Sequence, residues 1–173
     1  LEHAGIIYYF VDNEYYFGDS IYRGGNAEGE QYCFFSRVVA EAMPLLDFVP
    51  DILHLNDWHT AVLPLLLKTQ YGGHPQHNVK TLLTIHNIAY QGKFSLDFAR
   101  DMLGIADEYL TPCYMEYYGA ADFLKAGCVF ADKLNTVSPS YAEEILDDYY
   151  GEGLSGILRN RRADLCGILN GLD

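Results

Sequence analysis

Residues 51–59 read DILHLNDWH, and residues 80–92 read KTLLTIHNIAYQG. Each segment contains a short apolar run, at 52–55 and at 81–85, that predicts a β-strand. The residues between them, 61–71, are apolar and numerous enough for a helix. Strand, helix and strand in this order form a βαβ unit, whose second strand runs parallel to the first. The two segments therefore predict an α/β fold built on a parallel sheet.

Polar and ring-bearing residues cluster directly after both predicted strands. In open parallel sheets, ligands bind in the crevice outside the carboxyl ends of the strands. Seven residues fall there and form the candidate site: Asp57, Trp58, His59, His86, Asn87, Tyr90 and Gln91. Gly92 follows them and allows close approach of the backbone. Two such clusters on neighbouring turns converge on one crevice, and together they indicate a binding or active site.

The rest of the chain alternates strand-like and helix-like segments. Strands are predicted at 5–11, 52–55, 79–85, 133–137 and 165–169. Helices are predicted at 30–46, 59–71, 96–103, 122–130, 139–148 and 154–162, with a loop over 12–29 and an insertion over 111–119. This alternation predicts a single domain over 1–173, an α/β, Rossmann-like, doubly wound parallel sheet with helices on both faces.

The composition fits a globular, acidic protein. The 173 residues are 50% hydrophobic and carry a formal net charge of −13, which disfavours nucleic acid and anionic lipid as partners. No apolar run approaches the roughly 20 residues of a membrane helix, so no membrane association is expected. The four cysteines include no Cys-x-x-Cys pair. Their spacing argues against a zinc site and fits reduced thiols, so a cytoplasmic protein is expected.

The candidates in the first cluster also have structural interpretations. Asp57 stands where an N-cap would bind the free amides of the following helix, and position alone favours this interpretation. Trp58 and His59 could simply pack at the start of that helix. A metal site of His54, Asp57 and His59 is discounted, because His54 lies inside a strand and the other two lie beyond its end.

The second cluster and a serine segment have structural interpretations too. His86 and Asn87 could be a turn pair, since Asn tolerates unusual backbone angles. For residues 138–140 (SPS), Ser138 as a helix cap is favoured over nucleophilic catalysis. The chain has no Gly-x-Ser-x-Gly elbow and no P-loop lysine. The polar clusters after the two strands are therefore the better candidates for a functional site.

Six segments, in order along the chain, resemble the signatures of bacterial glycogen synthases and plant starch synthases. They are 9–17 (YFVDNEYYF), 54–59 (HLNDWH), 84–92 (TIHNIAYQG), 123–127 (FLKAG), 135–141 (NTVSPSY) and 167–173 (GILNGLD). The resemblance covers nearly the whole chain, and the ordered combination is highly specific to this family.

The resemblance implies a GT-B glycosyltransferase, with two Rossmann-like domains and an active site in the cleft between them. It implies retaining transfer of glucose from ADP-glucose to the non-reducing end of an α-1,4-glucan, in glycogen biosynthesis. The partners are then the glucan acceptor and the nucleotide-sugar donor, with no cofactor and no metal ion. The choice between ADP-glucose and UDP-glucose and the oligomeric state stay open.

The resemblance also implies roles for individual residues. His86 matches the family histidine that contacts the transferred glucose, and Asp57 and His59 match the segment that lines the sugar and acceptor side. Asn87 matches the neighbouring polar contact, and Tyr22 matches a tyrosine in the cleft. We therefore expect His86 and Asp57 to be catalytic. The expected substrate-binding residues are His59, Asn87, Tyr90, Gln91, Gly92 and Tyr22.

Parts of the family pattern do not occur here. These are the Lys-x-Gly-Gly-Leu loop of the first βα turn, which helps bind the donor, and the C-terminal donor domain with its cations near the phosphates. The loop over 23–31 also departs from the family, with GGNAE at 24–28. We therefore expect part of the N-terminal, acceptor-side domain of a longer protein, inactive alone. The rivals are another GT-B transferase, such as a sucrose synthase or mannosyltransferase, and a non-catalytic glucan-binding module.

Overall fold

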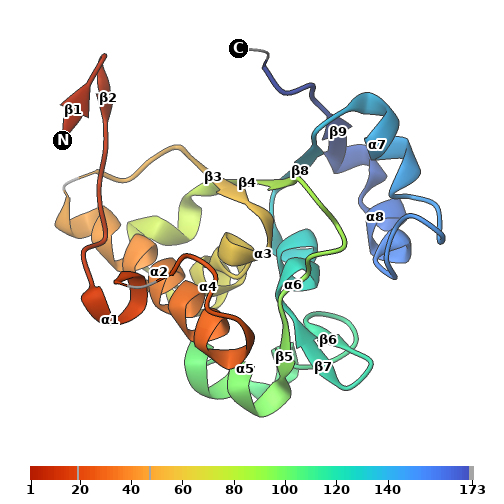
Figure 1. Ribbon diagram of the computed structural model, residues 1–173, viewed down its shortest axis with the longest axis horizontal. Helices are drawn as coiled ribbons and strands as arrows, with labels where there is room; N and C mark the ends of the chain where they lie inside the picture. The colour runs from red at the N-terminus through yellow and green to blue at the C-terminus, as the bar shows by residue number, and fades with distance from the viewer. Residues whose placement is uncertain (19, 47, 172–173) are drawn as a thin grey trace.

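A four-stranded parallel sheet lies at the centre of the computed structural model, which describes residues 1–18, 20–46 and 48–171 (Figure 1). Its strands are β3 (Ile52–Asn56), β4 (Lys80–Ile85), β8 (Lys133–Thr136) and β9 (Leu165–Gly167), in the order β3-β4-β8-β9. All three pairings are parallel. The predicted α/β parallel sheet is confirmed, and four of the five predicted strands belong to it. The last two residues of the 167–173 segment lie outside the described residues.

One face of the sheet forms the core. Leu55, Leu83, Ile85 and Leu134 lie on it and are at most 2% exposed, since residues two apart along a strand share a face. Helices α4 (Leu63–Gln70) and α6 (Phe123–Phe130) contact each other and bury apolar side chains with this face. The core therefore forms between the sheet and a layer of helices.

The connecting helices of the described chain gather on that same face. Because strand order follows chain order, right-handed crossovers bring successive helices to one side of the sheet. Figure 1 shows α4, α6 and the short helix α3 (Asp57–Thr60) on the same side of β3 and β4. Helices are also predicted on the opposite face of the sheet. The connecting helices of the described chain do not cover Ile52 on that face, and its side chain is 63% exposed.

Helix α2 (Gly25–Leu45) begins before its predicted start at residue 30. Gly24 precedes it with φ +73°, a conformation that favours glycine. The Glu28 carboxylate accepts a hydrogen bond from the Gly24 amide at 2.8 Å, which satisfies a donor at the helix start. A further short helix, α1 (Glu14–Phe17), also lies within the predicted loop. Within the described ranges no helix, α2 included, has the length and apolarity needed to cross a membrane.

The single helix predicted over 59–71 is wrong. The chain forms α3 and α4 instead, with Ala61 and Val62 between them. Pro64 explains the break, because proline has no amide to donate within a helix and is tolerated only in a first turn. It lies in the first turn of α4.

The strand predicted over 5–11 does not join the sheet. Its residues 6–7 form β2 (Ile6–Ile7), which pairs antiparallel with β1 (Glu2–His3) in a separate hairpin. Ala4 and Gly5 make the turn, with φ of +50° and +77°. Ile6 is 56% exposed, so the apolar character of this segment does not come from burial in the described sheet.

A small antiparallel sheet follows the second candidate cluster. Its strands β5 (Lys93–Ser95), β6 (Glu116–Tyr117) and β7 (Ala120–Asp122) lie in the order β5-β7-β6. Between them, α5 (Leu96–Leu103) has the predicted bounds. Ser95 caps it by accepting from the Phe98 amide at 3.1 Å, and Gly104 ends it with φ +63°.

The last helices are shorter than predicted. Helix α7 (Pro139–Glu144) is capped by Ser138, which accepts from the Tyr141 amide at 3.0 Å and confirms the capping interpretation. Beyond it, the Asp147 carboxylate accepts from the Tyr149 amide and turns the chain. Helix α8 (Ser155–Asn160) completes the layer. The described ranges also contain the 3₁₀ turns η1 (Pro75–Asn78), η2 (Asp107–Tyr109) and η3 (Arg162–Asp164).

Arg161 joins the end of α6 to the segment before β9. Its guanidinium donates to the carbonyls of Cys128, Val129, Ala131 and Asp132 at 2.7 to 3.2 Å. Its Nε also donates to a carboxylate oxygen of η3. Carbonyls at a helix C-terminus have no partner within the helix, so one cation here satisfies several acceptors.

We predict that Arg161→Ala lowers the free energy of unfolding by about 2–4 kcal/mol, because it leaves several part-buried carbonyls unsatisfied. The matched control is Arg162→Ala, since Arg162 pairs with Glu143 and both side chains are mostly exposed. That change should cost about 0–1 kcal/mol. Urea unfolding of both variants measures the difference. Equal losses would contradict the role given to Arg161.

Candidate active site

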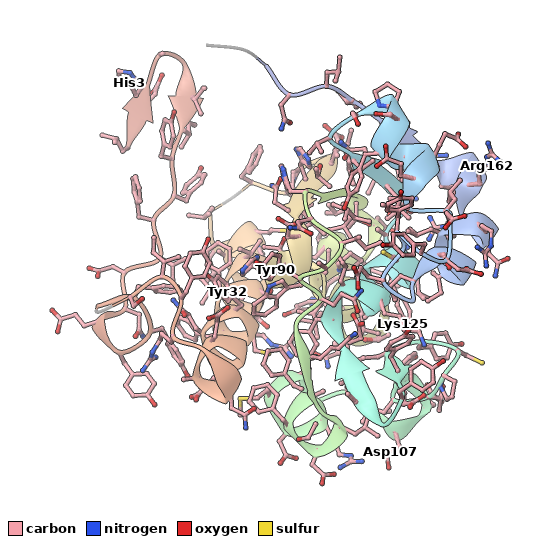
Figure 2. The ribbon with its side chains drawn as sticks, turned by 45° about the vertical axis from the view of Figure 1, so that its right-hand side comes forward. His3, Tyr32, Tyr90, Asp107, Lys125 and Arg162 are labelled. Atoms are coloured by element: carbon pink, nitrogen blue, oxygen red, sulfur yellow. The ribbon has the colours of Figure 1, made fainter. Side chains whose placement is uncertain are left out.

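A cavity of about 520 Å³ opens at the carboxyl ends of β3 and β4. Its lining residues are Tyr22, Glu28, Asp57, Trp58, His59, Asn87 and Tyr90. Figure 2 labels Tyr90, on the loop after β4, and Tyr32 of α2, whose ring contacts that of the lining residue His59. Five of the eight predicted site residues therefore line one cavity. Gln91 and Gly92 line an adjoining hollow of about 300 Å³. His86 is exposed and is not among the lining residues of either space.

Asp57 links the two strand ends. Its Oδ1 accepts hydrogen bonds from the backbone amides of His86, at 2.8 Å, and Asn87, at 3.5 Å. Its own backbone has φ +53°, in the left-handed region that costs a non-glycine residue about 1–3 kcal/mol. The N-cap interpretation of Asp57 is wrong, because Asn56 holds the cap position of α3 and the carboxylate reaches to the next βα turn instead.

His86 is held at two points by the β3–α3 turn. Asp57 binds its amide, and its ring Nε2 lies 2.9 Å from the Asn56 Oδ1. Thr60 fixes Asn56 in turn, because its hydroxyl accepts from the Asn56 amide and donates to the Asn56 carbonyl. Asn56 is not among the predicted site residues, although its place at the end of β3, directly before Asp57, was the available signal.

His59 and Trp58 form the floor of the cavity. Trp58 is 6% exposed and its ring stacks on that of His59 with centroids 4.3 Å apart. Tyr32 meets the His59 ring edge-on at 4.4 Å. Burial lowers the pKa of His59 below its ordinary 6.5, and the Asp57 and Glu28 carboxylates only partly oppose this shift. The His59 imidazole is therefore neutral at pH 7.

The first turns of α2 supply a wall that the sequence analysis did not predict. Glu28 lines both the cavity and the adjoining hollow. Its position follows from the early start of α2 at Gly25. The two consecutive glycines, Gly24 and Gly25, are typical of a loop, so the sequence predicted a later helix start. Tyr22, in the loop before the helix, is 70% exposed and its ring centroid lies 6.3 Å from that of His59. The segment that departs from the family pattern thus borders the site.

The loop after β4 combines lining and structural roles. Asn87 accepts from the Ala89 amide at 3.0 Å, so the turn interpretation holds while its side chain also lines the cavity. Tyr90 is 67% exposed at the rim. The Gln91 side chain is buried and donates to the carbonyls of Ile88 and Glu152. It shapes the loop from within the fold.

Gly92 allows this loop to lie directly on Trp58. Its φ is +65°, and a Cβ built there would stand 2.3 Å from the Trp58 ring. Any larger residue would displace the loop or the indole. The contact between Gly92 and Trp58 therefore sets the distance between the loop after β4 and the residues that follow β3.

The N-terminus of α6 supports the same loop from below. The amides of Phe123 and Leu124 donate to the carbonyls of Gly92 and Gln91 at 3.1 and 3.0 Å. Asp122 caps the helix by accepting from the Lys125 amide at 2.8 Å, and it is 0% exposed. A buried carboxylate therefore holds the helix that holds the site loop.

Burial raises the pKa of Asp122 from its ordinary 3.8 to about 6. The amide hydrogen bond from Lys125 and the Lys93 ammonium, 4.0 Å from Oδ2, act in the opposite direction. Oδ2 has no hydrogen-bond partner within the described part of the chain, so nothing replaces the water that the charged form loses.

The lining of the cavity suits a neutral, hydroxyl-rich ligand. Two carboxylates, an amide and two phenols can bind hydroxyl groups, and aromatic rings offer apolar faces for stacking. Of the residues that the structure describes, no lysine or arginine lines the cavity, and Lys93 is the one cation among the residues that line the adjoining hollow. Among the described residues, no group of three His, Cys, Asp or Glu side chains is placed to hold a metal ion. His54 bonds Thr84 on the sheet instead.

The profile of the starch synthase catalytic domain family matches residues 1–160. This chain belongs to that family. The chain is 49% identical to the glycogen synthase of Clostridium novyi, over all of the chain and 36% of that relative. It is 45% identical to the glycogen synthase of Geobacillus stearothermophilus, over all of the chain and again 36% of the relative. The chain thus spans just over a third of the curated relatives that it matches.

A solved structure of this family has the same fold. The catalytic domain of starch synthase IV from Arabidopsis thaliana, bound to ADP and acarbose, matches with a TM-score of 0.77 and 28% identity. The match covers 83% of this chain and 30% of the plant chain. The Rossmann-like α/β fold, as in this part of a starch synthase catalytic domain, is therefore confirmed.

We predict that Asp57→Ala loosens the junction of the two strand ends in this starch synthase family member. The amides of His86 and Asn87 lose their acceptor, and alanine is strained at φ +53°. The free energy of unfolding should fall by about 1–3 kcal/mol. Hydrogen exchange at those two amides should accelerate. Asp57→Asn is the matched variant, because asparagine tolerates this φ and keeps an acceptor oxygen. Unchanged exchange in Asp57→Ala would contradict the linkage.

We predict that Asp122→Asn stabilises the protein progressively as pH rises. The folded-state pKa of Asp122, about 6, lies above its unfolded value, so the folded state binds the extra proton and loses stability as pH climbs through 6. Asparagine keeps the cap and does not titrate. The stability difference from wild type should grow by about 1–3 kcal/mol between pH 4 and 8. Urea unfolding across this range measures it, with the exposed Asp101→Asn as control. A constant difference would refute the prediction.

Proposed function

We propose that these residues are part of a glycogen or starch synthase, a retaining glycosyltransferase that adds glucose from ADP-glucose to the non-reducing end of an α-1,4-glucan. In this proposal the 173 residues are the acceptor-side wall of the active site, within the N-terminal domain of a longer protein. The reaction takes place in the cytoplasm and needs no metal ion or other cofactor. The four cysteines, all free thiols, support a reducing compartment.

One observation carries the proposal: in a member of this family, predicted site residues from two βα turns and from the loop before α2 line one cavity. Tyr22, Asp57, His59, Asn87 and Tyr90 come together there. Their hydroxyl, carboxylate and amide groups suit the hydroxyls of a neutral sugar. The ADP and acarbose bound to the related plant enzyme support the same pair of ligand classes, an adenine nucleotide and an α-glucan mimic.

The distribution of charge supports a second wall that binds the donor. A nucleoside diphosphate needs cations, and the cavity has none among its lining residues. Cations from another domain would neutralise the leaving diphosphate. The sugar then becomes oxocarbenium-like, and the acceptor hydroxyl attacks from the face that the diphosphate leaves. The residues of this wall orient the sugar and the acceptor.

A non-catalytic glucan-binding role is the second candidate, and the absence of cations from the cavity lining favours it. Two experiments separate the candidates. Isothermal titration measures the affinity of the 173-residue chain for maltooligosaccharide and for ADP-glucose. An activity assay measures glucose transfer by the full-length protein and by the 173 residues. Glucose transfer by the full-length protein and none by the 173 residues supports the proposal. A full-length protein that binds glucan without transferring glucose refutes it. The same assay with UDP-glucose settles the donor.

We predict that His86→Ala in the full-length protein lowers kcat about 10²-fold or more, the scale on which one preorganised hydrogen-bonding group acts. Stability should change little, because the side chain is exposed beside the site. Steady-state kinetics and thermal melts of the same preparations measure both quantities. Normal turnover with a lowered melting temperature would assign His86 to the turn rather than to catalysis.

A further inference from the structure

We propose that Asn56 is a positioning residue that fixes the proton of His86 on Nε2, so that Nδ1 accepts a hydrogen bond from a substrate hydroxyl. The contact that carries this inference joins the Asn56 Oδ1 and the His86 Nε2 at 2.9 Å. The role of Nδ1 toward a sugar hydroxyl rests on the proposed function. The assignment of the proton does not.

The position of Asn56 is fixed independently of His86. It is the last residue of β3, paired in register with Thr84 of β4. The Thr60 hydroxyl bonds both its amide, at 2.9 Å, and its carbonyl, at 3.1 Å. The Asn56 side chain therefore extends from a backbone that is fixed at the end of β3. Its register partner Thr84 precedes His86 by two residues.

His86 is equally constrained on its backbone side. The Asp57 carboxylate holds its amide at 2.8 Å, so neighbouring residues of one turn bind the amide and the ring. One contact fixes the backbone of His86 and the other fixes its ring. Among the described residues the Asp57 carboxylate bonds the two amides of the next turn, and the hydrogen bond to the ring comes from Asn56.

The chemistry of the pair decides the tautomer. An amide oxygen only accepts hydrogen bonds, so the ring nitrogen that faces it must carry the proton. A neutral imidazole with Nε2–H has its lone pair on Nδ1. Within the described chain, Nδ1 has no hydrogen-bond partner. His86 is exposed and precedes Asn87, which lines the cavity, so we infer that a hydroxyl-bearing ligand in the cavity can reach this lone pair.

The first test is nitrogen-15 NMR of the histidine rings in the 173-residue chain, at a pH where His86 is neutral. Wild type and Asn56→Asp should both show His86 with the proton on Nε2, because each residue offers an acceptor oxygen. Asn56→Ala should show a mixture of the two tautomers. Asn78→Ala is the matched control, since Asn78 is an exposed asparagine in η1, outside the site. A proton on Nδ1 in wild type, or no change in Asn56→Ala, would overturn the inference.

Thermal melts of Asn56→Ala and Asn56→Asp show whether both variants are folded. A merely structural role for Asn56 predicts no change of tautomer in a folded Asn56→Ala chain.

The second test uses the full-length protein and steady-state kinetics. Asn56→Ala should lower kcat about tenfold or more, the scale on which outer partners of a functional histidine act, with a smaller effect on KM. Asn56→Asp should restore much of the rate, because the carboxylate also offers an acceptor oxygen to the ring. Unchanged kcat in Asn56→Ala would overturn the role of Nδ1. If wild type transfers no glucose at all, the proposed function fails while the tautomer result still decides the position of the proton.

Discussion

The hydrogen bonds from the amides of His86 and Asn87 to the Asp57 carboxylate are the constraint on which the site depends. Parallel pairing of β3 and β4 brings the ends of the two strands together, and the carboxylate fixes the turns that follow them. The left-handed backbone of Asp57 aims its side chain across the sheet rather than at its own helix. Strain at this residue is thus part of how the two turns keep a common geometry.

Packing beneath the turns holds the same geometry from the other side. Gly92 lies on the Trp58 ring at a distance that excludes any side chain, and the first amides of α6 bind the carbonyls beside it. The cap of α6 is a carboxylate that burial makes costly to ionise. The site loop therefore rests on a helix whose N-terminal cap, Asp122, responds to pH.

The charge of the cavity connects its structure with the proposed reaction. Glu28 and Asp57 contribute carboxylates, His59 stays neutral, and the lining provides no cation for a diphosphate. Such a surface binds hydroxyl groups well and phosphates poorly. The proposed function explains why this wall has no cation. The glucan acceptor is neutral and would bind here, whereas the donor carries a diphosphate and would bind a cationic wall on the other side.

Local patterns in the sequence are enough to predict the βαβ core, four of the strands and the convergence of the two polar clusters. Strand periodicity is local, and parallel strands necessarily place their carboxyl ends at one edge. The folded chain adds three contacts that no local pattern predicts: Asp57 bridges two turns, Asn56 meets the His86 ring and Glu28 lines the cavity. These outcomes depend on the backbone angle of one residue, on strand register and on where α2 begins. The segment over 5–11 is a further example in which the local pattern was not sufficient. Its apolar residues predicted a strand of the sheet, but a strand joins a sheet only by pairing with a neighbouring strand, and here residues 6–7 pair with 2–3 in a separate hairpin.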